Sequence, residues 1–120
     1  MSDANIVHRE LAAGRWRDFA LVEQMANVGS EVERALAWAS RGNQEFSGRA
    51  LERGLELLGL TIADPKHRHR LKELTRVRET LLDYFLGDNH YASTADGWHR
   101  YFHAFGMAAA IRREFAARGE

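Results

Sequence analysis

Two charged side chains that fall among apolar ones are the first candidates for chemistry in this sequence. Glu33 and Arg78 each lie inside the apolar stripe that the surrounding segment forms at about 100° per residue. Because a buried charge without a partner is costly, we expect the two to bind each other, or to bind Tyr84 or backbone groups. The favoured interpretation is a core salt bridge that sets helix register. The alternative is a small cavity in which Arg78 holds an anionic ligand, lined by Glu33, Arg78, Tyr84 and His103.

Helical spacing also groups two histidines. His99 and His103 are four residues apart, so both rings can project to the same side of a helix, and Asp96 one turn earlier can add an oxygen ligand. This spacing suits a metal ion. The sequence has no Glu-x-x-His motif and no His-Glu-x-x-His motif. We therefore favour histidines at a boundary or interface, and we expect no cofactor.

Positive charge is concentrated in residues 66–70, which read KHRHR. Such a cluster at a helix N-terminus can contact phosphates, because the helix dipole adds to the attraction. No aromatic residue is interleaved in it to stack bases. A solvated turn balanced by nearby acids is the favoured interpretation, and we do not expect nucleic acid as a partner.

The loop at residues 87–91 combines polar, flexible and ring-bearing residues. Loops held by a rigid scaffold often carry function, and His90 beside Asp88 could act as a general base. No serine, threonine or cysteine is placed by the sequence to be its nucleophile. The sequence thus predicts no catalytic residue, and we lean towards a protein that is not an enzyme.

Four helical stretches must position these groups. Apolar residues recur at helical spacing, the chain has one proline, and its ten glycines lie mostly near segment ends. Residues that end or start helices separate these stretches. Gly42 and Asn43 suit a turn, Asp64 and Pro65 suit a helix start, and Ser93 with Asp96 suits a capping box. The predicted helices cover about 19–40, 44–63, 65–86 and 94–117.

Short connections make neighbouring helices antiparallel. The predicted fold is therefore all-α, an antiparallel up-down-up-down four-helix bundle that forms a single domain over residues 1–120. Residues 5–16 precede the bundle as a short extra helix or as an arm that docks on a partner.

The last helix has two apolar faces. Its core face is aromatic, with Trp98, Tyr101, Phe102 and Phe105 followed by Ala109. A second strip, made by Met107, Ile111 and Phe115, lies on a side away from these residues. Two apolar faces on one helix usually mean that one of them meets another chain or a terminal arm. We therefore predict that the strip is an interface.

Composition narrows the class of protein. Seventeen basic and seventeen acidic residues give a formal net charge of zero, so no global field attracts nucleic acid or anionic lipid. There is no cysteine, which fits a reducing compartment. No apolar run approaches the roughly 18 residues of a membrane span, and the first residues do not resemble a secretion signal. We expect a cytoplasmic protein that does not enter membranes.

Parts of the sequence resemble known helical proteins. The segments LKELTRVRE (71–79), DYF (83–85) and WHRYF (98–102) are similar to a group of short uncharacterised prokaryotic four-helix-bundle proteins. In outline the chain also resembles the HEPN-type bundles, some of which are toxin ribonucleases and some of which partner small nucleotidyltransferases. Their catalytic signature is an arginine followed after four to six residues by a histidine, and no arginine here has a histidine at that distance. The resemblance therefore implies a topology without the ribonuclease chemistry.

Three functions remain, in order of preference. The first is a non-enzymatic interaction module that binds itself or a small protein partner through the last helix and the N-terminal arm. The second is a small-ligand or nucleotide-phosphate binder that uses Arg78 and Glu33. The third is weak nucleic-acid contact through residues 66–70.

Overall fold

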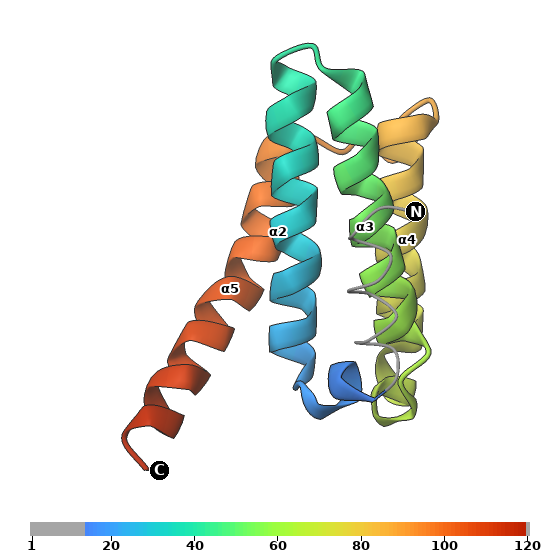
Figure 1. The fold of residues 1–120 in the computed structure, drawn as a ribbon. Coiled ribbons are helices and arrows are strands. Elements are labelled where there is room, and N and C mark those ends of the chain that lie inside the picture. The colour runs from blue at the N-terminus through green and yellow to red at the C-terminus, as the bar shows by residue number, and fades with distance from the viewer. Residues whose placement is uncertain (1–13, 120) are drawn as a thin grey trace.

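The computed structural model describes residues 14–119, and this part of the chain is all-α, as predicted. Two short 3-10 helices accompany four α-helices that run up, down, up and down as a bundle (Figure 1). The elements in chain order are η1 (Arg15–Asp18), α2 (Leu21–Ser40), α3 (Gln44–Ile62), η2 (Pro65–Arg70), α4 (Leu71–Leu86) and α5 (Ala95–Ala117). The arm predicted for residues 5–16 lies mostly outside the described residues.

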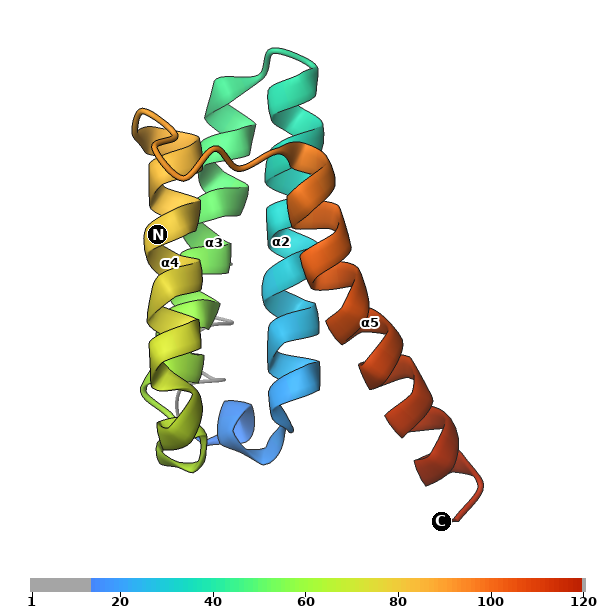
Figure 2. The same ribbon diagram turned by 180° about the vertical axis from the view of Figure 1, so that it is seen from behind.

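Helix α2 is the centre of the arrangement. It packs against α3 on one side and α5 on the other, and α4 packs mainly on α3. The segment between α4 and α5 crosses one end of the bundle, and α5 then runs away from its neighbours at an angle (Figure 2). The bundle is therefore closely packed along α2 and α3, while the far half of α5 stands apart from it (Figures 1 and 2).

The core is formed by one apolar face from each helix. These faces follow the 3.6-residue period, so burying them removes apolar surface from water without burying the charged faces. The buried side chains include Met25, Val28 and Val32 of α2, Leu57 and Leu58 of α3, Leu74, Val77 and Leu81 of α4, and Trp98 and Phe102 of α5. The aromatic core face predicted for the last helix is confirmed, with Tyr101 and Phe105 partly buried beside Trp98 and Phe102.

Two helix starts differ from the prediction. The predicted helix at 65–86 is divided into η2 and α4, with a non-helical residue at His67 (φ −101°, ψ 16°) whose side chain is buried. Helix α5 is capped by Thr94, whose side chain accepts from the N–H of Gly97. The predicted capping box of Ser93 and Asp96 is wrong because Ser93 belongs to the loop, where its N–H and C=O both bond to the side chain of Asn89.

Helices α2 and α5 approach closely at one glycine. A Cβ atom built on Gly29 would lie 2.8 Å from the Cβ and 2.9 Å from the Cδ1 of Phe102. The Cβ of Phe102 is fixed to its backbone, so it cannot move aside without shifting α5. The absence of a side chain at Gly29 thus allows Phe102 to enter the core.

We predict that Gly29→Ala lowers the free energy of unfolding by about 1 to 3 kcal/mol, because overpacking forces α5 away from α2. Urea denaturation followed by circular dichroism measures this change. The matched control is Gly48→Ala in α3, where an added Cβ meets no atom within 4 Å. Replacing this exposed helical glycine should stabilise the protein by about 0.5 to 1 kcal/mol. Equal effects at the two positions would contradict the close approach.

Candidate interaction surface

The predicted apolar strip of α5 is exposed. Met107, Ile111 and Phe115 have 51%, 50% and 51% of their surface accessible to solvent. They are spaced four residues apart, so they follow one another along one side of the helix. Large apolar side chains in a continuous row are unusual on the surface of a monomer, whereas scattered ones are common. No described helix, α5 included, is both long and apolar enough to cross a membrane.

Among the described residues, the far end of this helix has few contacts with the bundle. Every residue from 110 to 119 is exposed, and Ala109 is the last buried residue of α5. Within residues 14–119, an ion pair between Arg112 Nε and Glu23 Oε1, at 3.0 Å, joins this end to the bundle. A second pair, Arg118 with Glu114, lies within the helix. The apolar strip of this helix is therefore left in contact with water by residues 14–119.

The predicted pair of Glu33 and Arg78 does not form. Arg78 is exposed on α4, and Glu33 binds His99 of α5, with 2.6 Å between its carboxylate and Nδ1 of the ring. The prediction was wrong because both positions were placed inside an apolar stripe by helical angle. Glu33 lies at the edge of its stripe, where a carboxylate remains partly solvated, and Arg78 is turned to water beside the buried Val77.

The ligand cavity predicted around these residues is not assembled either. Glu33 and His103 line a groove of about 370 Å³ between α2 and α5, together with His99 and Phe102. Tyr84 lies elsewhere, against Phe85 and Trp98 in the aromatic cluster. The groove therefore contains no cation from α4, and it cannot bind an anion in the way that we expected.

The structure does not support a metal site at Asp96, His99 and His103. Among residues 14–119, no three histidine or carboxylate side chains are arranged to hold a metal ion. His99 and His103 do share one side of α5 and line the same groove, but His99 is already bound to Glu33. The ion pair of Glu33 and His99 links α2 to α5 at the bundle surface.

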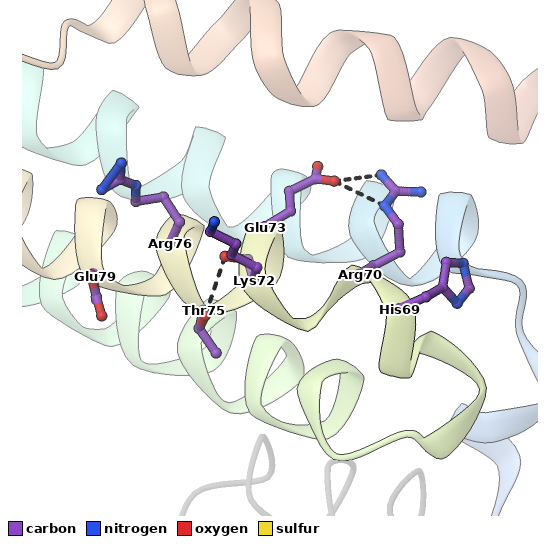
Figure 3. Close-up of a pocket in the computed structure, with 7 residues that line it drawn as sticks. All are labelled: His69, Arg70, Lys72, Glu73, Thr75, Arg76 and Glu79. Atoms are coloured by element: carbon purple, nitrogen blue, oxygen red, sulfur yellow. Dashed lines mark hydrogen bonds and ion pairs between the residues drawn. The ribbon is translucent and has the colours of Figure 1, made fainter.

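The basic cluster at residues 66–70 is largely neutralised. Lys66 binds Asp64 at 2.8 Å and the carbonyl of Arg17, and Arg70 donates two hydrogen bonds to Glu73. A hollow of about 610 Å³ lies along α4 beside this cluster and is lined by both signs of charge (Figure 3). In Figure 3 the Arg70 fork faces the Glu73 carboxylate, so this guanidinium is occupied. A phosphate chain would have to compete with these pairs.

Sequence reasoning missed a buried polar cluster at the end of the bundle where η1 and η2 meet. Gln24 is at its centre. Its Nε2 donates to the carbonyl of Trp16 at 2.8 Å and to Asp64 at 3.2 Å, and its Oε1 accepts from His67 Nε2 at 2.6 Å. The indole of Trp16 donates to Thr61 at 3.2 Å. Each of these residues is at most 4% exposed, so the cluster ties four elements together from the inside.

The surroundings in the cluster lower the pKa values of His67 and Asp64. Burial lowers the pKa of His67 below its ordinary 6.5, although the nearby Asp64 opposes the shift. Burial alone would raise the pKa of Asp64, but hydrogen bonds from Lys66 and Gln24 outweigh it and hold this pKa below its ordinary value. His67 is thus neutral in the folded protein, with its proton on Nε2. The hydroxyl of Thr61, also in the cluster, is bonded on both sides, since it accepts from the Trp16 indole and donates to the carbonyl of Leu57 at 2.9 Å.

We predict that the protein loses stability as the pH falls below 6.5. The unfolded chain takes up a proton at His67 that the folded chain resists, so the stabilisation is complete above pH 6.5 and is lost as the pH falls through the lower folded pKa. Asp64 acts in the same direction below its ordinary 3.8. Urea denaturation at a series of pH values measures the slope.

His67→Gln should reduce the slope of the unfolding free energy against pH at pH values above those at which Asp64 takes up a proton, because glutamine does not titrate. The control His90→Gln removes a histidine whose side chain is 81% exposed, and it should keep the wild-type slope. An unchanged slope in His67→Gln would contradict the role given to this histidine.

Comparison of the chain with protein-family models, with curated proteins and with solved structures finds no match.

Proposed function

We propose that this chain is a non-enzymatic, self-associating interaction module, in which the apolar strip of α5 packs against the same strip of a second copy. The observation that carries the proposal is the exposure of Met107, Ile111 and Phe115 on a stretch of helix that stands clear of the bundle (Figure 2). Burying such a strip removes apolar area from water, which favours association.

The spacing of the strip favours a second copy as the partner. Met107 and Phe115 lie four residues on either side of Ile111. In an antiparallel pair related by a two-fold axis at Ile111, each Met107 therefore meets the Phe115 of the other copy. Such an interface is self-complementary, as two-fold dimers require.

The residues beside the strip support the same arrangement. Two small residues, Ala104 and Ala108, continue its apolar side towards the bundle. In the antiparallel register they lie opposite Arg118 and Glu114 of the second copy, so small side chains meet long ones whose stems can cover them. Arg118 and Glu114 already neutralise each other at 2.6 Å, and the chain has no net charge, so the copies do not repel.

Two further features support a module of the cytoplasm. The chain has no cysteine to oxidise, and its balanced charge gives no attraction to anionic membranes. The neutralised pairs around residues 66–70 favour a protein partner over nucleic acid.

We predict that Ile111→Glu weakens self-association by roughly 100-fold, which corresponds to about 2.7 kcal/mol, because it places a carboxylate in the centre of the apolar contact. Sedimentation equilibrium across micromolar concentrations measures the association of wild type and variant.

The matched control is Ala110→Glu, which adds the same charge to the neighbouring exposed position, about 100° around the helix from the strip. It should associate as the wild type does. A wild-type protein that stays monomeric throughout, or an equal effect of the two variants, would contradict the proposal.

A further inference from the structure

The loop after α4 crosses one end of the bundle and leads into α5 (Figure 2). A separate pocket is lined by residues of α4, of this loop and of the first turns of α5. Its volume is about 320 Å³, within the range of small-molecule sites. Val77 of α4 and the rings of Trp98 and Tyr101 form its apolar wall, and Arg76, Thr80 and Ser93 are among its polar residues. It shares no residue with the exposed strip of α5.

Trp98 is the largest side chain that lines this pocket. The residue is 6% exposed, and its indole packs on Phe102 and edge-on against Tyr84 and Tyr101. Its ring is therefore held in place by the core and gives the pocket a flat, rigid apolar wall.

The pocket is also positive. Arg76 is its only charged lining residue, and its guanidinium lies 5.3 Å from the ring centroid of Tyr91. The loop holds Tyr91 there, because the carboxylate of Asp83 accepts the backbone N–H of His90 at 2.9 Å and of Tyr91 at 3.0 Å.

The start of α5 adds to the positive electrostatic potential of the pocket. Its first turn carries the positive end of the helix dipole, and Gly97 of that turn lines the pocket, with its own N–H bonded to the side chain of Thr94. Asp96 lies in the same turn but does not line the pocket. An anion thus meets a guanidinium and a helix N-terminus, with no carboxylate in the lining.

We propose that this pocket binds a small carboxylate with a flat apolar body, such as an aromatic acid. The carboxylate pairs with Arg76, while the ring lies against Trp98 and Tyr101. Arginine suits this role because its planar fork matches a carboxylate. The proposal does not depend on self-association through α5.

Benzoate is the probe, and nitrogen–proton correlation spectra of the full chain are the measurement. The chain has three tryptophans, so three indole signals report separately. We expect benzoate to shift the Trp98 indole signal saturably at roughly 1 mM, as befits a ligand of its size, while the Trp16 and Trp38 signals stay in place. Benzamide, which has the same shape and an acceptor oxygen but no charge, should bind about tenfold more weakly.

Arg76→Gln should weaken benzoate binding by about tenfold, the factor of one charge-assisted hydrogen bond. Lys72→Gln is the matched control, because it removes a positive charge one turn earlier on α4 at a residue that lines the neighbouring hollow but not this pocket. It should leave binding unchanged. A Trp98 signal that does not respond to benzoate, equal binding of benzamide, or equal losses in the two variants would overturn the proposal.

Discussion

The contact of Phe102 with α2 at Gly29 determines how the rest of the molecule is arranged. Because no side chain stands at Gly29, the ring of Phe102 enters the core and fixes the rotation of α5 about its own axis. With Phe102, Trp98 and Ala109 turned inward, the helical period places Met107, Ile111 and Phe115 on the other side, in solvent. The exposed strip is thus a consequence of the core packing.

The two halves of α5 differ in what holds them. The first half is held by the aromatic cluster and by a hydrogen bond from the Tyr101 hydroxyl to Glu73 at 3.0 Å. Burial of Tyr101 and the nearby Glu73 carboxylate raise the pKa of this hydroxyl. The second half has Ala109 as its last buried residue and one ion pair to Glu23. An exposed ion pair contributes little to stability. The Gln24 cluster therefore joins η1 and η2 to the bundle from the inside, whereas none of the residues from 14 to 119 buries the far end of α5.

Sequence periodicity predicted the four helices well because each buries a broad apolar face, and it predicted the exposed strip because Met107, Ile111 and Phe115 share one side. It failed for Glu33 and Arg78. Helical angle alone does not tell the edge of a stripe from its centre. It also does not show which helix faces Glu33, and the partner of Glu33 is His99 of α5 in place of Arg78 of α4.

The buried polar cluster was missed for a related reason. Gln24 and His67 are far apart in sequence, and only the packed η1 and η2 bring Trp16, Asp64 and Thr61 around them. The signal that could have pointed to it was the Asp64-Pro65 helix start, with His67 in its first turn. The divergence of α5 also had no sequence signal, since its helical pattern continues to the end.

Cysteine cross-linking can report whether two copies pair antiparallel about Ile111, because the sequence has no cysteine of its own. In the proposed dimer the two copies of residue 111 face each other, whereas the two copies of residue 107 are about 12 Å apart along the helix. We expect Ile111→Cys to oxidise readily to a disulfide-linked dimer and Met107→Cys alone to stay unlinked. Ready cross-linking at residue 107, or none at residue 111, would rule out the proposed dimer.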